Sequence, residues 1–282
     1  MKVIALVENA RLPGRDDLAS EHGLSLCIFT HDQQILFDTG VSGVFHSNAQ
    51  KLDVDTAQAT LAVISHHHFD HGGGLASFFD ANQQAKVYLR SSRTEDFYFE
   101  FLGLIKRRIG LDENLFQQHA HRFAWVNETC EIAPGIFILT QIGKRYPPPK
   151  GNRHLFARVG RSRQRDDFEH ELILVVREEA GLTVFSGCSH RGILNVLDAV
   201  LEHFSGQTIQ AVFGGFHLID LPLINNMAES KADVEELGCA LLKYPINVVY
   251  TGHCTGTKAF RILKGVMGAK LEYFATGCTA EL

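Results

Sequence analysis

Four potential metal ligands stand within six positions of one short segment of the chain. They are His66, His68, Asp70 and His71, in the pattern His-x-His-x-Asp-His. Neutral imidazole and carboxylate are ligands that Zn²⁺ and other first-row divalent metals accept. A polar loop with several surface histidines is the alternative, but this density of donors, followed at once by three glycines, favours a metal site. We therefore predict that the loop binds metal.

The segments on either side of this loop explain how its side chains could converge. The apolar run 60–64 has the length and composition of a buried strand. After the loop, residues 72–81 place Leu75, Phe78 and Phe79 on one face of a helix. The ligands thus lie between the end of a strand and the start of a helix.

The same succession of strand, glycine-bearing loop and histidine recurs three times in the second half of the chain. The predicted strands and the histidines that follow them are 182–185 with His190, 209–213 with His217 and 247–250 with His253. A single histidine after a strand is usually structural. Repetition at equivalent positions instead predicts that these histidines gather at one sheet edge and share a site with the His-x-His-x-Asp-His loop.

This loop resembles the signature loop of the metallo-β-lactamase superfamily. The resemblance implies an α/β fold, a four-layer αββα sandwich with two metal ions at the sheet edges. It also implies two ligand sets, which are His66, His68 and His190 for one ion and Asp70, His71 and His253 for the other. Flavodiiron members of the superfamily carry Glu where His68 stands, so the histidine favours hydrolytic or transfer chemistry.

Other positions near the loop either match or depart from the family pattern. Asp38, in Phe-Asp-Thr-Gly, could be a simple turn residue, but it matches a family aspartate that orients the loop through hydrogen bonds. His217 stands where the family has a bridging Asp, with Asp220 three residues on. We expect His217 to lie beside the metals as a ligand, a proton donor or a phosphate contact, and we count it with Asp70 as catalytic. His67 falls on an alternate position and is expected to point elsewhere.

Several phrases resemble a narrower branch, named after the dihydropterin-ribofuranosylaminobenzene phosphate synthase of methanopterin biosynthesis. They lie at 7–9, 21–25, 36–40, 187–193, 214–218 and 251–256. The branch loop usually reads His-Gly-His-Tyr-Asp-His, so His67 and Phe69 depart from it away from the ligand positions. The resemblance does not by itself fix the substrate. Cys188 and Cys254 could bind metal as thiolates, but the neighbouring histidines fit the family positions better, and we treat both cysteines as packing residues.

Residues 144–165 contain eight Lys and Arg side chains and no acid. Such a run is commonly a solvated surface loop. A long irregular loop can also be a lid, and guanidinium groups over the metals would favour phosphate or carboxylate groups. We predict that Arg145, Arg153 and His22 contact a small anionic or phosphorylated substrate. The acidic chain, of net charge −5, does not favour nucleic acid as a partner.

Composition indicates an ordinary globular protein, with 45% hydrophobic and 21% charged residues among 282. We expect one domain over 1–282, with an irregular insert or lid at about 90–168. Within it we expect a helix over 42–52 capped by Ser42, a helix that ends near 107–108, and irregular backbone over 142–165. No apolar run reaches the length of a membrane span, no signal-peptide pattern is present, and six scattered cysteines favour a cytoplasmic location.

These features together predict a dinuclear-metal-dependent hydrolase or transferase that acts on a phosphate-bearing or other anionic small metabolite, in the manner of the synthase branch. Zn²⁺ is the favoured metal, with Mn²⁺ and Fe²⁺ as alternatives. Two divalent ions lower the pKa of water to near neutrality and clamp an oxyanion. The competing hypotheses are an RNA- or DNA-processing phosphodiesterase, a mononuclear-iron oxidative enzyme and a metal-dependent binding protein. The sequence indicates no oligomeric state.

Overall fold

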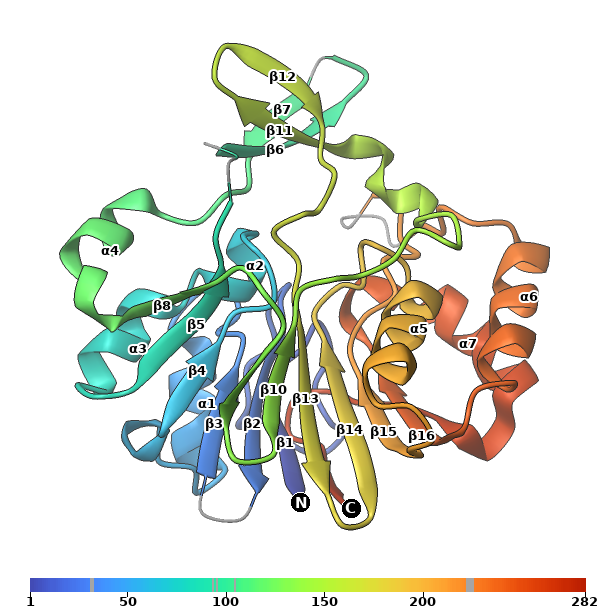
Figure 1. The fold of residues 1–282 in the computed structure, drawn as a ribbon, viewed down its shortest axis with the longest axis horizontal. Helices are drawn as coiled ribbons and strands as arrows, with labels where there is room; N and C mark the ends of the chain where they lie inside the picture. The colour runs from blue at the N-terminus through green and yellow to red at the C-terminus, as the bar shows by residue number, and fades with distance from the viewer. Residues whose placement is uncertain (31–32, 93, 95, 104, 222–225) are drawn as a thin grey trace. The chain divides into compact units, whose positions relative to one another are not determined.

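The computed structural model describes residues 1–30, 33–92, 94, 96–103, 105–221 and 226–282. The chain forms two compact units (Figure 1). Unit 1 comprises Met1–Val126, Phe156–Gln164 and Phe274–Leu282, and unit 2 comprises Asn127–Leu155 and Arg165–Tyr273. That the two units form a single domain stays a prediction.

Unit 1 contains a seven-stranded sheet in the order β18-β1-β2-β3-β4-β5-β8. Its strands are β1 (Lys2–Val7), β2 (Ser25–Thr30), β3 (Gln33–Phe37), β4 (Leu61–Val63), β5 (Lys86–Arg90), β8 (Phe123–Val126) and β18 (Thr279–Glu281). The strands from β1 to β3 pair antiparallel, and the turn between β2 and β3 includes residues outside those described. From β3 to β8 the pairing is parallel, so the carboxyl ends of β3, β4 and β5 meet at one edge.

The helices of unit 1 are short. They are α1 (Val44–Lys51), α2 (Phe69–Gly72), α3 (Leu75–Ala81) and α4 (Glu113–Gln118), with 3-10 turns η1 (Thr56–Gln58) and η2 (Ala120–Arg122). Phe45, Leu75 and Phe78 are fully buried with strand residues in one core cluster. The predicted cap of the first helix is wrong by one residue, because Gly43 occupies the N-cap and the Ser42 hydroxyl accepts the Val44 N–H instead.

A four-stranded sheet in the order β12-β11-β6-β7 corrects two further predictions. Its strands are β6 (Asp96–Phe101), β7 (Ile105–Arg108), β11 (Leu155–Val159) and β12 (Ser162–Arg165). The helix expected to end near 107–108 is therefore strand β7, and residues 155–165 are largely strand instead of irregular backbone. Cross-strand contacts explain the first error, because Arg108 pairs with Tyr98 and the Lys106 ammonium lies 4.3 Å from the centre of the Tyr98 ring.

Unit 2 also contains a seven-stranded sheet, in the order β17-β16-β15-β14-β13-β10-β9. Its strands are β9 (Cys130–Ala133), β10 (Ile136–Leu139), β13 (Ile173–Glu178), β14 (Gly181–Ser186), β15 (Ile209–Phe213), β16 (Ile246–Thr251) and β17 (Leu271–Tyr273). Strands β14, β15 and β16 are adjacent and parallel, so their carboxyl ends lie at the same edge.

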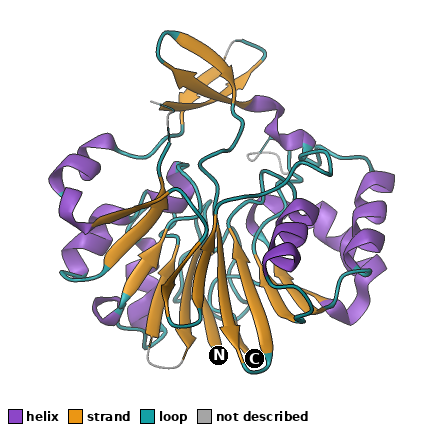
Figure 2. Ribbon diagram, in the orientation of Figure 1, coloured by secondary structure: helices purple, strands orange, loops and turns teal. Residues whose placement is uncertain are grey.

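Three helices cover one side of this sheet (Figures 1 and 2). They are α5 (Ile193–His203), α6 (Lys231–Leu241) and α7 (Thr257–Met267), and the 3-10 turns are η3 (Lys150–His154), η5 (His253–Thr255) and η6 (Gly268–Lys270). Val196, Val234 and Leu263, one from each helix, are fully buried in a core cluster with the strands. Among the described residues, no helix has the length and apolarity needed to cross a membrane.

Candidate metal centre

Unit 1 gathers the four predicted ligands of the His-x-His-x-Asp-His loop just after β4. All four side chains are buried. The His66 ring centre lies 4.6 Å from that of His68 and 4.1 Å from that of His71. The loop runs directly into α2, so Asp70 and His71 stand in its single turn. Buried imidazoles this close together, beside a carboxylate, form a donor set of the kind that divalent metals use.

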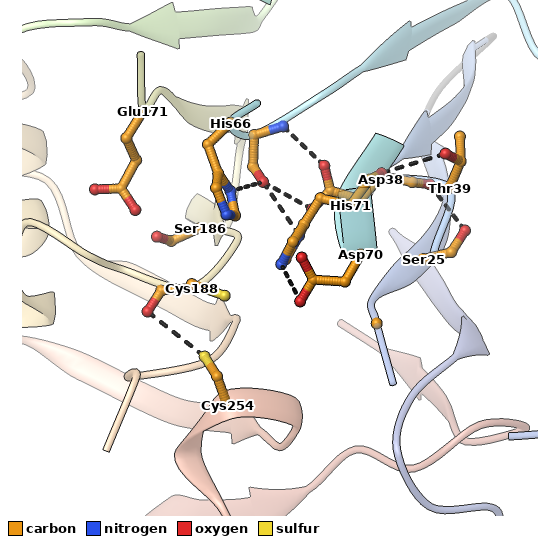
Figure 3. A network of polar contacts seen from close by, with 12 residues as sticks. Ser25, Asp38, Thr39, His66, Asp70, His71, Glu171, Ser186, Cys188 and Cys254 are labelled. Carbon is orange, nitrogen blue, oxygen red and sulfur yellow. Dashed lines mark hydrogen bonds and ion pairs between the residues drawn. The ribbon is translucent and has the colours of Figure 1, made fainter. Parts of the chain in front are cut away.

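Asp38 lies against this loop and contacts its residues, while its orienting role stays a prediction (Figure 3). Its Oδ2 is 2.6 Å from His71 Nδ1, and its carboxylate accepts the Ser65 N–H at 2.7 Å and the Ser65 hydroxyl at 2.8 Å. Burial raises the pKa of the Asp38 carboxyl, whereas His71 and Ser65 act in the opposite direction. Ser65 Oγ in turn lies 2.9 Å from His66 Nδ1.

His22, which we predicted to contact substrate, lies beside a predicted metal ligand. Its Nε2 is 3.3 Å from Asp70 Oδ2, and its Nδ1 is 3.2 Å from Asn9 Nδ2. Its side chain is 37% exposed, and its contact with a substrate stays a prediction. A role for His22 in positioning Asp70 was not part of the sequence prediction.

His67 points away from the other histidines, as the sequence predicted. Its Nε2 lies 2.7 Å from the Arg90 carbonyl oxygen, and its ring packs near Phe97, Phe116 and Trp125. These contacts give His67 a structural role in the loop.

Unit 2 brings His190, His217 and His253 to one edge of its sheet, since they follow the parallel strands β14, β15 and β16. The ring centres of His190 and His217 are 4.2 Å apart. The potential ligand atoms of Cys188, His190 and His217 all lie within 4.8 Å of one another, and those of Cys188, His253 and Cys254 do likewise.

His190 is fixed by contacts that the sequence did not reveal. The Glu171 carboxylate accepts the backbone N–H of His190 at 2.7 Å and that of Arg191 at 3.0 Å. Asn152 Oδ1 lies 2.9 Å from His190 Nδ1, while Asn152 Nδ2 donates to the His190 carbonyl oxygen at 2.8 Å. The Phe168 ring stacks on the imidazole with centres 4.4 Å apart. Burial raises the pKa of Glu171, and the two N–H donors oppose that shift.

Three residues at this edge have left-handed backbone. Ser189, His217 and His253 have φ values of 53°, 49° and 48°. Residues other than glycine seldom adopt this conformation, which costs about 1 kcal/mol or more. Such backbone is concentrated at functional sites, and it occurs here in each loop that carries one of the three histidines.

Cys188 and Cys254 are buried and pack with Ile219, in keeping with the packing role predicted for them. Cys254 Sγ accepts the His217 N–H at 3.2 Å and lies 3.7 Å from the Cys188 carbonyl oxygen (Figure 3). None of the six cysteines, all of which lie in the described part of the chain, forms a disulfide.

Arg145 and Arg153, the other predicted substrate contacts, form ion pairs within unit 2. Arg145 Nη1 lies 3.4 Å from Asp198, and Arg153 Nη2 lies 2.5 Å from Asp220. Burial raises the pKa of Asp220, but Arg153 and His154 outweigh it and hold that pKa below its usual range. Both arginines have exposed side chains, and their role toward substrate stays a prediction.

The hydrogen bonds of the histidine rings indicate that these donor sets fit metal ions. The Nδ1 atoms of His66, His71 and His190 contact Ser65, Asp38 and Asn152, respectively. Metal-ligating histidines typically engage one ring nitrogen in this way, which orients the ring and makes the other nitrogen the ligand. The three rings are therefore arranged to bind metal through Nε2.

Comparison with known proteins identifies the class of protein. Residues 22–185 match the metallo-β-lactamase superfamily. The chain belongs to this superfamily, and the predicted α/β fold of the αββα type is confirmed.

Individual relatives show which members of the superfamily this chain resembles. The chain is 28% identical, over 85% of its length and 83% of the relative's, to 7,8-dihydropterin-6-methyl-4-(β-D-ribofuranosyl)-aminobenzene-5'-phosphate synthase of Methanocaldococcus jannaschii. The chain is also 32% identical in sequence to Tm1679, a metal-dependent hydrolase of the β-lactamase superfamily whose crystal structure is known. The two structures superpose with a TM-score of 0.82, over 100% of this chain and 99% of that one. Zn²⁺-bound PqqB from Methylobacterium extorquens shares the fold at 12% identity, with a TM-score of 0.58 over all of both chains.

Proposed function

We propose that this protein is a dinuclear-metal-dependent hydrolase or transferase that acts on a phosphate-bearing or other anionic small metabolite. The observation that supports it most strongly is the set of Nδ1 contacts of His66, His71 and His190, which prepare Nε2 of each ring for a metal. A purely structural cluster of buried histidines would not need this common orientation.

The ligand assignment follows the superfamily pattern. One ion is held by His66, His68 and His190, and the other by Asp70, His71 and His253. Zn²⁺ suits these nitrogen and oxygen ligands, and Mn²⁺ or Fe²⁺ are the alternatives. Bound ions of this kind lower the pKa of water and stabilise a developing oxyanion.

The protein's own residues supply orientation and proton transfer. Asp38 and Asn152 hold imidazoles in place, and His22 contacts the Asp70 carboxylate. His217, whose ring lies 4.2 Å from that of His190, is a further ligand or a proton donor to the substrate. Its place beside His190 supports either role.

The relative from Methanocaldococcus jannaschii supports a synthase-like transfer as the particular reaction. In that version, an arylamine attacks the methylene carbon of a pterin and a diphosphate leaves. In the hydrolase version, water attacks phosphorus or a carbonyl carbon. A generic aryl phosphodiester separates the two, since strong turnover without a pterin would count against the synthase.

The first test is the metal content of protein purified without added metal, together with the His253→Ala variant. About two equivalents per chain, falling toward one in the variant, is the expected result because His253 belongs to only one ligand set. One equivalent in both proteins would overturn the dinuclear proposal and bring mononuclear chemistry forward.

A further inference from the structure

We propose that a cavity of unit 2 beside His190 binds the phosphate and the adjoining ring of an aromatic or heterocyclic phosphomonoester. The proposal rests on the proposed function, whose substrate class it names. The cavity has a volume of about 660 Å³, which is in the range of pockets for small metabolites. His190 forms part of its wall, so a ligand there reaches a predicted metal ligand.

Cationic side chains outnumber acidic ones in the cavity lining. Its charged residues are Lys144, Arg145, Lys150, Arg153, Arg165 and Arg191, against Asp166 and Asp167. This positive excess contrasts with the net charge of −5 on the whole chain. A concave surface lined by one sign of charge concentrates ligands of the opposite sign, and guanidinium groups match the geometry of phosphate oxygens.

One of the two carboxylates is turned toward its own loop. Asp166 is buried, accepts the Phe168 N–H at 2.9 Å and lies 3.1 Å from His170 Nε2. Its charge is thus compensated locally and opposes an incoming anion less than an exposed carboxylate would.

Three of the cations are paired with acids outside the lining. Arg145 pairs with Asp198, Arg153 with Asp220, and Lys150 with Asp233. The three cationic side chains are half or more exposed. Arg145, which is 74% exposed and lies 3.4 Å from Asp198, is the cation for which a phosphate dianion can compete most readily, because such an ion pair contributes little stability. Asp220 and Glu229 are largely buried and hold Arg153 and Lys150 more firmly.

The remaining wall is apolar and firmly held. Tyr146, Pro147, Pro148 and Pro149 all contribute to the lining. Asn195 anchors the start of this segment, because its side chain accepts the Tyr146 N–H at 2.8 Å and donates to the Tyr146 carbonyl oxygen at 2.9 Å. Phe168, stacked on His190, adds an aromatic face. A rigid apolar wall beside cations suits a flat ring that carries a phosphate.

The test is calorimetric binding of phenyl phosphate to the full chain as purified and to the Lys144→Ala/Arg165→Ala variant. These substitutions leave the three ion pairs above intact. The matched control is Lys106→Ala/Arg161→Ala, which removes the same charge from two exposed residues outside the cavity lining. Phenol, benzoate and inorganic phosphate are compared with phenyl phosphate, and the metal content of each protein is measured.

We expect phenyl phosphate to bind at least tenfold more tightly than phenol, benzoate or inorganic phosphate. The cavity variant should lose at least tenfold in affinity with its metal content unchanged, while the control keeps the wild-type affinity. Unchanged affinity in the cavity variant, or an equal loss in the control, would overturn the proposal. Benzoate binding as tightly as phenyl phosphate would overturn the phosphate assignment.

The two proposals fail separately. If the cavity variant loses binding but no phosphoester is turned over, the binding site stands and the proposed function fails. If phosphoesters are turned over with a KM that the cavity variant leaves unchanged, the function stands and this site is wrong.

Discussion

Glu171 joins the backbone of a predicted metal-binding loop to the sheet of unit 2. It is fully buried two residues before β13, and its two oxygens accept the N–H groups of His190 and Arg191. Because β14 ends close before His190, these hydrogen bonds set the direction in which the loop leaves the sheet. Neither the charge nor the position of Glu171 in a run of acids distinguished it in the sequence.

The substitution Glu171→Gln should destabilise the protein by about 1–3 kcal/mol. The amide can still accept one N–H, but its NH₂ group would face the other and leave a buried donor unsatisfied. Urea unfolding measures the change in the free energy of unfolding.

The neighbouring Glu169→Gln serves as the control, since Glu169 is exposed. It should change stability by less than about 0.5 kcal/mol. Equal stabilities of the two variants would show that the Glu171 carboxylate does not support the His190 loop.

At the scale of elements, Gly73 marks a closely packed point of the backbone between helices α2 and α3 of unit 1. Gly73 has ordinary helical backbone, so alanine would fit its dihedral angles. A Cβ there would nevertheless lie 2.5 Å from the Phe69 carbonyl oxygen and still closer to that of Val41. Alanine therefore requires backbone movement where α2 leads into α3.

Gly73→Ala should destabilise the protein by about 1–3 kcal/mol, the usual cost of overpacking. Gly265→Ala provides a matched comparison, because Gly265 lies inside α7 with nothing within 4 Å of its added Cβ. That variant should gain about 0.5–1 kcal/mol from helix propensity. Thermal or urea unfolding of both proteins checks the opposite signs, and a stable Gly73→Ala variant would contradict the close packing seen here.

The elements that the sequence predicted well are those in which hydrophobic spacing and burial agree. Helices α5, α6 and α7 each present an apolar stripe to the sheet. Hydrophobic spacing predicts helices over 193–204, 231–242 and 258–266, and these bounds agree with the structure to within about one residue. Strand β7 gave no such signal, because Lys106, Arg107 and Arg108 are exposed and its pairing depends on a partner strand. Tertiary pairing of this kind cannot be read from local periodicity.

For the whole molecule, the sequence motifs revealed the candidate metal ligands but not the residues that hydrogen-bond to them. The repeated histidines after strands β4, β14, β15 and β16 were visible in the sequence because each follows an apolar run. Asn152 and Glu171 were not, since both act through hydrogen bonds to residues far along the chain. The ion pairs of Arg145 and Arg153 were hidden for the same reason.

Metal removal should loosen one part of the molecule before the rest. If the ions hold the loops of His190 and His253, chelation removes binding energy that stabilises the folded state, about 2.7 kcal/mol when free metal is 100 times its Kd. Cys188 and Cys254 lie in or beside these loops and are buried. They should then react with iodoacetamide at least tenfold faster, as followed by mass spectrometry, because local opening exposes them.

Two other cysteines make this experiment decisive. Cys27 lies in β2 of unit 1, where burial raises the pKa of its thiol to about 12, so it should stay protected unless the whole chain unfolds. Cys239 is exposed and should react at one rate with or without chelator. Faster labelling of Cys27 alongside the other two would mean global unfolding. Unchanged labelling of Cys188 and Cys254 would mean that metal does not hold these loops, and the ligand roles of His190 and His253 would have to be abandoned.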